Sequence, residues 1–75
     1  MNNIPVINTR ATGANIKSIM RSKNISTSEL QSKLGFNTPQ SIFKWLRGDM
    51  MPSLDNLVIL AHILNTTIDN IIVTN

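Results

Sequence analysis

The chain has 75 residues, a formal net charge of +3 at pH 7, one histidine and no cysteine. This length suits one domain near the lower limit for independent folding, and the lack of cysteine excludes disulfides and thiolate metal sites. No apolar run approaches the roughly 20 residues that cross a bilayer, and the N-terminus lacks the basic start and long apolar core of a secretory signal. We therefore expect a cytoplasmic protein that makes no membrane contact.

An N-terminal arm over residues 1–11 is predicted to precede a domain over residues 12–75. The Ile4–Ile7 segment favours extended backbone, and its proline is unsuited to a helix interior. The first helix is expected from Thr12 or Gly13 to about Ser22. Its apolar residues recur at helical spacing and are predicted to face inward: Ile16, Ile19 and Met20.

The second helix, over residues 26–34, has a strong start signal. Ser26 with Glu29 three places later forms a capping box, and Ile25 with Leu30 occupies the positions of a hydrophobic staple. Gly35 follows, where a helix ends readily with positive φ.

A third helix is predicted over residues 38–47, with Thr38 as N-cap, Pro39 at the first helical position and Gly48 after the last turn. Its apolar face consists of Ile42, Trp45 and Leu46, so that Trp45 is expected in the core rather than as a stacking platform.

Two helices joined by a short turn, the second carrying outward polar side chains, form the layout of a DNA-binding helix-turn-helix. Glutamine bonds adenine and lysine bonds guanine in the major groove, which makes Gln40 and Lys44 candidates for base contacts. Phe43 either touches a thymine methyl or packs on Phe36. The full set expected at base edges is Thr38, Gln40, Ser41, Phe43 and Lys44.

The fourth helix, capped by Ser53 and running to about Leu64, is apolar on nearly every side. Asn65 is expected to adopt left-handed backbone after it, and Thr67 to cap a short fifth helix. His62 has no partner at ligand spacing and is expected at the surface.

At this point the sequence resembles the Cro/CI (XRE-type) helix-turn-helix domains of bacterial and phage repressors. The resemblance covers about residues 13–73 and depends on the joint order of several short motifs: Gly13…Ile16, Leu30…Leu34-Gly35, Ile42…Gly48, Pro52-Ser53-Leu54…Leu57…Ala61…Leu64 and Thr67-Ile68-Asp69. It implies an all-α, five-helix domain, with an extended N-terminal arm or a short terminal strand, that binds double-stranded DNA.

The sequence departs from the family pattern in three ways. The Phe36–Pro39 turn is one residue longer than the commonest one, and Gln31 replaces a small alanine between the two helices. A buried Arg–Glu pair of the family corresponds here to Met20 and Leu46. Replacing both ions by packed apolar side chains is often neutral or stabilising, whereas losing one leaves the other buried and unpaired.

The charges divide along the chain. All seven Lys and Arg residues lie in residues 1–47, where Glu29 is the only acid, and residues 48–75 contain three aspartates and no Lys or Arg. Such polarity suits one face for DNA phosphates and another turned away. The phosphate candidates are Lys17, Arg21, Thr27, Ser28 and Arg47. Lys17 and Arg21 alternatively form a solvated face, Thr27 and Ser28 alternatively cap their helix, and Arg47 alternatively caps the helix C-terminus.

The sequence offers no nucleophile–base–orienter set, no phosphate loop and no metal-ligand spacing, so we expect no enzyme and no cofactor. The function it predicts is a sequence-specific transcriptional regulator, a repressor of bacterial or phage type, with no small-molecule effector. The alternative is a protein-interaction module on the same fold, such as an antitoxin-like or anti-repressor partner.

A dimer on a two-fold operator is expected from the fourth helix, because a small domain cannot enclose apolar residues on all sides of it. The predicted interface comprises Ile59, Ile63, Ile71, Ile72 and Val73, with the Ile4–Ile7 arm as an optional addition. Alternatively, the protein's own N-terminal arm covers Ile59 and Ile63.

Overall fold

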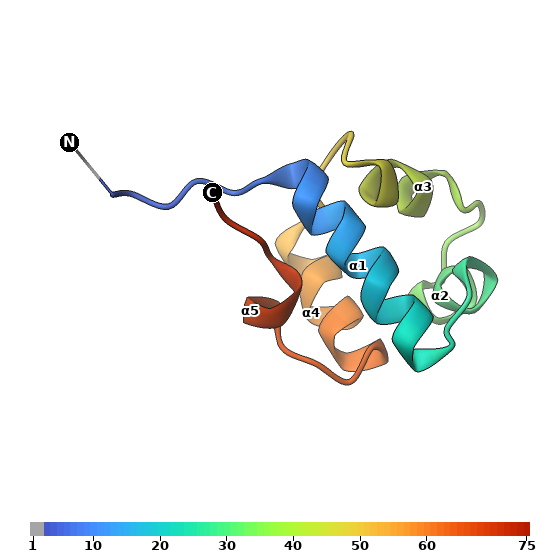
Figure 1. Ribbon diagram of the computed structural model, residues 1–75. Coiled ribbons are helices and arrows are strands. Elements are labelled where there is room, and N and C mark those ends of the chain that lie inside the picture. The colour runs from blue at the N-terminus through green and yellow to red at the C-terminus, as the bar shows by residue number, and fades with distance from the viewer. Residues whose placement is uncertain (1–2) are drawn as a thin grey trace.

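The computed structural model describes residues 3–75 and contains five helices (Figure 1). In chain order they are α1 (Thr9–Lys23), α2 (Thr27–Leu34), α3 (Gln40–Arg47), α4 (Leu54–Ile63) and α5 (Ile68–Ile71). Pairing of extended backbone in the described part of the chain is limited to one isolated antiparallel bridge, between Ile7 and Thr74. The expected all-α, five-helix fold is therefore confirmed.

Three helices begin where their capping residues predict. In each, a hydroxyl accepts a hydrogen bond from the backbone N–H three residues on, at 3.1–3.2 Å, which satisfies one of the free donors of the first turn. The capping residues are Ser26 for α2, Ser53 for α4 and Thr67 for α5.

The start of α1 was predicted too late. The side chain of Asn8 accepts a hydrogen bond from the N–H of Ala11 at 2.9 Å, and the helix begins at Thr9 rather than at Thr12 or Gly13. Asparagine is a strong N-cap, and no residue between it and Gly13 disfavours a helix. The arm before the first helix therefore ends at Asn8.

Four helices end in the same way. A residue with φ between 53° and 79° follows the helix or its last turn, and the next N–H bonds the carbonyl five residues back at 2.9–3.0 Å. This arrangement satisfies carbonyl groups that the helix leaves free. The left-handed residues are Asn24, Gly35, Gly48 and Asn65, and glycine and asparagine adopt this backbone most readily.

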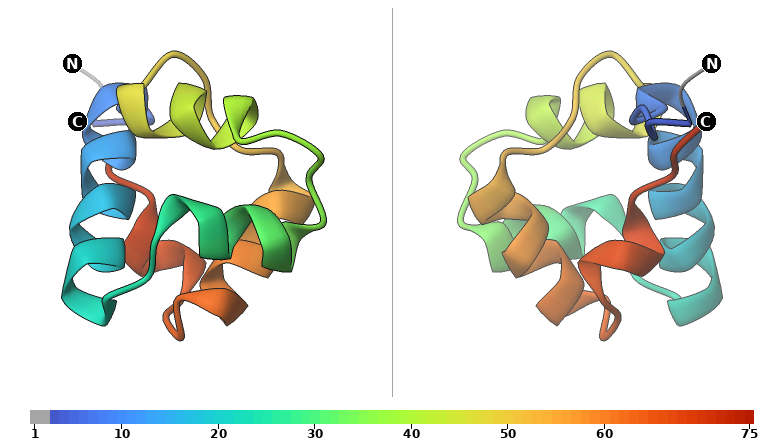
Figure 2. Two further views of the ribbon diagram at one scale, coloured as in Figure 1. Left: turned by 90° about the vertical axis from the view of Figure 1, so that its right-hand side faces the viewer. Right: turned by 90° about the vertical axis from the view of Figure 1, so that its left-hand side faces the viewer.

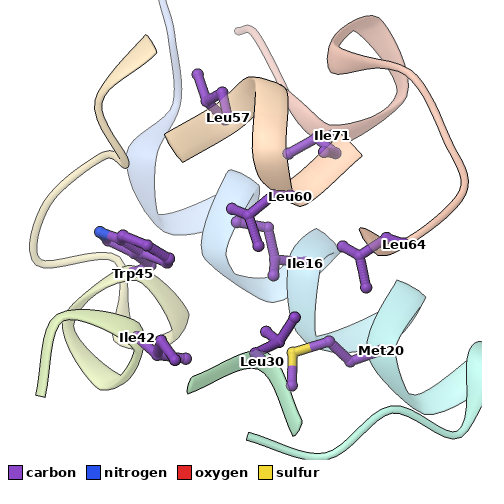
Figure 3. Close-up of a cluster of buried hydrophobic side chains, with 9 residues drawn as sticks. All are labelled: Ile16, Met20, Leu30, Ile42, Trp45, Leu57, Leu60, Leu64 and Ile71. Atoms are coloured by element: carbon purple, nitrogen blue, oxygen red, sulfur yellow. The ribbon is translucent and has the colours of Figure 1, made fainter. Parts of the chain in front are cut away.

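All five helices contribute to a single core (Figure 3). Its buried side chains are Ile16, Met20, Leu30, Ile42, Trp45, Leu57, Leu60, Leu64 and Ile71. Met20 is 6% exposed, and the half-buried Leu46 packs against the same cluster. The two apolar replacements for the family's ion pair thus both belong to the core region.

Close backbone approach fixes α1 against α3. A Cβ on Gly13 would collide with the carbonyl oxygen of Trp45, and a Cβ on Gly48 would lie 2.5 Å from the Cα of Arg10. Only glycine permits such contact between the first turns of α1 and the end of α3. This contact orients α3 relative to the rest of the domain.

The C-terminal segment pairs with the end of the arm and with α1 (Figure 1). Backbone bonds of 2.8 Å run from the N–H of Asn8 to Val73 and from the N–H of Asn75 to Val6. The buried hydroxyl of Thr12 accepts a hydrogen bond from the N–H of Val73 at 3.0 Å. The end of the arm and the C-terminal segment therefore pair through one isolated bridge rather than as a full strand.

No helix within residues 3–75 is both long enough and apolar enough to span a membrane.

Candidate nucleic-acid interface

Figure 1 shows the α2–turn–α3 unit on the side of the molecule opposite the two chain ends, and the left view of Figure 2 looks onto that side. Helix α2 ends at Gly35, and the chain bends through Asn37, Thr38 and Pro39 before α3 begins. Both helices are eight residues long. This is the helix-turn-helix arrangement that the sequence predicts.

The start of α3 differs from the expected one. Thr38 does not cap the helix, because Pro39 occupies the capping position, makes no side-chain hydrogen bond there, and is followed by Gln40 as the first helical residue. The longer turn accounts for this shift. It places Gln40 at the N-terminal tip of α3, where side chains of such a motif reach base edges.

Helix α3 has two distinct faces. Ile42 and Trp45 are buried, whereas Gln40, Ser41 and Lys44 are exposed. Gln40 and Lys44 are four residues apart and therefore share one side of the helix. Thr38, in the turn, is also exposed. The polar side chains predicted to contact bases are thus all exposed, and two of them, Gln40 and Lys44, share one side of α3.

The aromatic residues of the motif divide as core and surface. Trp45 is 3% exposed, and its ring makes an edge-on contact with Phe36 at a centroid distance of 5.8 Å. This confirms the prediction that Trp45 belongs to the core. Phe36 thus packs edge-on against Trp45, and the side chain of Phe43 is 44% exposed. The exposure of Phe43 leaves it accessible for contact with a thymine methyl, the first of the two interpretations of this residue.

The residues predicted to contact phosphate occupy three helices. Lys17 and Arg21 are exposed on α1, and Ser28 is exposed in the first turn of α2, where Thr27 is half-buried. The capping bond of α2 is made by Ser26 rather than by either of these hydroxyls. Their assignment as simple caps is therefore wrong, although phosphate contact remains a prediction.

Arg47 has a partner that the sequence did not suggest. Its Nε donates to Oδ2 of Asp49 at 2.9 Å, and both side chains are more than half exposed. The carbonyls at the end of α3 are satisfied by backbone N–H groups of Gly48 and Asp49, so that Arg47 is not needed as a cap. The sequence alone does not reveal this pair, because an Arg and an Asp on either side of a glycine meet only in certain loop conformations.

Gln31, noted above only as a departure from the family pattern, also has a specific contact. Its Nε2 donates to the carbonyl oxygen of Phe36 at 3.3 Å, across the turn. The side chain is half-buried. A glutamine at this position therefore makes a hydrogen bond to the turn that precedes α3.

The predicted dimer residues do not all lie at the surface. Ile71 is fully buried in the core, so its assignment to an interface is wrong, and Ile63, Ile72 and Val73 are half-buried. Ile59 is 39% exposed. In so short a fifth helix, periodicity cannot tell the inward residue from its neighbours.

The most exposed apolar side chains of α4 are not among the residues predicted for the dimer interface. Leu54 is 70% exposed and Val58 is 54% exposed, one helical turn apart. The alternative in which the arm covers Ile59 and Ile63 is wrong, because the arm extends away from the body and its Ile4 and Val6 are 71% and 58% exposed (Figure 1). Leu54, Val58 and Ile59 together are called the α4 outer face below.

Comparison with known proteins identifies the fold. A family model, HTH_3, described as helix-turn-helix, matches residues 16–71. The restriction-modification controller protein C.AhdI from Aeromonas hydrophila is 21% identical with a TM-score of 0.75, over 84% of this chain and 94% of that one. The clp gene regulator ClgR from C. glutamicum is 20% identical with a TM-score of 0.77, over 93% and 88% of the two chains.

The same fold also occurs within a longer chain. The structure of apo-HppE is 25% identical with a TM-score of 0.75, but the match covers 84% of this chain and only 35% of that one. A search of curated proteins finds no match to this chain.

Proposed function

The chain belongs to the helix-turn-helix family of the Cro/CI (XRE) type, and on this basis we propose that it is a sequence-specific transcriptional regulator that represses genes from a two-fold symmetric DNA operator. The observation that carries the proposal is the two-faced α3, with Ile42 and Trp45 in the core and Gln40, Ser41 and Lys44 exposed. A helix held in this way presents a fixed polar surface to the major groove.

Gln40 and Lys44 supply the sequence preference. The amide of Gln40 donates one hydrogen bond to adenine and accepts another from it, and the ammonium of Lys44 donates hydrogen bonds to O6 and N7 of guanine. Thr38 and Ser41 add hydroxyls on the same surface, and Phe43 packs against a thymine methyl. The geometry that favours these roles is their common exposure around the first turns of α3.

Phosphate contacts orient the domain on the duplex. Lys17, Arg21 and Arg47 supply charge, and the first turn of α2 adds the hydroxyls of Thr27 and Ser28 beside its free N–H groups. Such contacts are independent of sequence and make the affinity strongly dependent on salt. The protein acts as a cytoplasmic homodimer without a small-molecule effector.

Replacing Gln40 by alanine tests the role of α3. We expect binding to the preferred site to weaken by about 1–3 kcal/mol, with preference lost at one base pair per half-site. The preferred site is first selected from random duplex DNA with the wild-type protein, and titrations with that site and with random DNA then compare the two proteins.

The matched control is Lys17→Ala on α1, which removes a proposed phosphate contact rather than a base contact. It should weaken binding to both DNAs equally and reduce the salt dependence. If Gln40→Ala also weakens both DNAs equally, Gln40 does not contact a base.

The second candidate function is a protein-interaction module. The α4 outer face favours it, because exposed apolar clusters mark binding surfaces. Binding of the wild-type protein to duplex DNA that weakens steeply with salt supports the regulator, and the lack of such binding supports the module.

A further inference from the structure

The turn between α2 and α3 contains a reciprocal pair of hydrogen bonds. The N–H of Phe36 donates to the carbonyl of Gln31 at 3.0 Å, and Nε2 of Gln31 donates to the carbonyl of Phe36 at 3.3 Å. The first bond is the usual helix-ending one and is available to any residue at position 31. The second exists because this residue is a glutamine.

Phe36 also contacts α3. Its ring and that of Trp45 form a T-shaped pair with a centroid distance of 5.8 Å and an interplanar angle of 66°, which is a favourable arrangement for two aromatic rings. Trp45 is itself held in the core at 3% exposure (Figure 3). The side chain of Gln31 is therefore connected to α3 through a single turn residue.

Ile42 and the close approach of Gly13 to Trp45 hold the body of α3 against the core, but the turn that leads into α3 has few restraints of its own. Pro39 makes no side-chain cap, and Asn37 and Thr38 are exposed. The angle at which α3 leaves the turn thus depends on how firmly the preceding residues are held. Losing the Gln31 amide would leave a half-buried carbonyl without its side-chain donor, which favours a different turn conformation.

We propose that Gln31 is a positioning residue that sets the orientation in which α3 presents Gln40 and Lys44 to DNA. This inference rests on the proposed function. Bidentate contacts with base edges require side chains to be placed within about 0.5 Å, whereas contacts between flexible basic side chains and phosphate tolerate larger shifts. The loss of Gln31 should therefore reduce discrimination between sequences more than total affinity.

The test compares Gln31→Met with Ser32→Met. Methionine at position 31 keeps the length of the side chain but removes the donor. Ser32 is exposed on the same helix, and it contacts the turn only through its backbone carbonyl, which the substitution leaves in place. Circular dichroism establishes that both variants are folded. Acrylamide quenching of Trp45, the only tryptophan, then reports on the turn without DNA.

For Gln31→Met we expect increased quenching of Trp45 and a fall of about tenfold in the ratio of affinities for the preferred site and random DNA. The affinity for random DNA and its salt dependence should stay within about twofold of wild type. Ser32→Met should match wild type in every measurement.

One result overturns the role of Gln31: an unchanged ratio of the two affinities, whether neither DNA loses affinity or both lose it equally, as a purely structural defect would cause. A wild-type protein with no preference for any sequence is a different result. It overturns the proposed function, and with it any positioning role in base recognition.

Discussion

At the scale of single residues, the Arg47–Asp49 pair would set a cost on the phosphate contact that we propose for Arg47. To reach a DNA phosphate, Arg47 would have to leave the carboxylate 2.9 Å away, and that carboxylate would itself repel the phosphate backbone. Exposed pairs are worth little, about 0.2–1 kcal/mol, so the pair would lower the affinity for DNA without abolishing binding. We predict that Asp49→Asn strengthens DNA binding by about 0.5–1 kcal/mol on all sequences at low salt.

Titration of preferred and random duplexes at two salt concentrations measures this effect. Asp55→Asn removes the same charge from α4 and should leave DNA affinity unchanged. A gain confined to the preferred site, or no gain at all, would show that Arg47 does not reach phosphate.

Residue assignments on α3 were predictable because a single apolar stripe divides that helix. The spacing of Ile42 and Trp45 determines which neighbours are exposed, including Gln40 and Lys44. On α4 the same reasoning was incomplete, because apolar residues occur on every side. Leu54 and Val58 are exposed there only because the core of so small a domain ends at Leu57 and Leu60.

At the scale of helices, Gly13 determines how closely α1 packs on α3. In an isolated helix, Gly13→Ala would stabilise by about 1 kcal/mol through helix propensity. Here the added methyl collides with backbone oxygens of Trp45 and Leu46, which cannot rotate away as a side chain could. We predict a net loss of about 1–3 kcal/mol in the free energy of unfolding, measured by urea denaturation.

Ala14→Gly at the exposed neighbouring position is the control. It should cost only the propensity difference of about 0.5–1 kcal/mol. A Gly13→Ala variant as stable as wild type would mean that α1 and α3 separate without loss.

Helix boundaries were predictable where local chemistry decides them. Ser26, Ser53 and Thr67 cap their helices as expected, because a hydroxyl three residues before a free N–H suffices. Two helix starts were predicted wrongly for different reasons. The start of α1 depends on a local asparagine cap, Asn8, that the prediction overlooked, whereas α3 begins after a turn that Gln31 bonds from the previous helix.

At the scale of the molecule, α3 and α4 lie on different sides of the domain (Figure 2). The basic residues belong to the part of the chain that includes α1–α3, and α4 follows with aspartate as its only formally charged residue type. A partner bound on α4 would therefore leave α3 free. This separation of surfaces is consistent with either a regulator that dimerises or a module that binds another protein.

The α4 outer face is the surface through which we expect two copies to associate. Leu54, Val58 and Ile59 are exposed by 70%, 54% and 39%, and association through one such patch on each copy produces a two-fold dimer. Two α3 helices related by that axis would occupy major grooves about 34 Å apart, one turn of DNA. The arm is a poorer candidate for this contact, since Pro5 lacks an N–H for pairing along its edge.

We predict that the double variant Val58→Lys with Ile59→Lys is folded but monomeric, and that it binds the operator less tightly than wild type. Both side chains are exposed, so stability should change little, whereas two charges on each copy oppose association through this face. Sedimentation at micromolar to high micromolar concentrations measures the oligomeric state. Ser18→Lys on the exposed side of α1 adds charge elsewhere and should remain dimeric. Wild-type protein that sediments as a monomer throughout this range would refute the dimer.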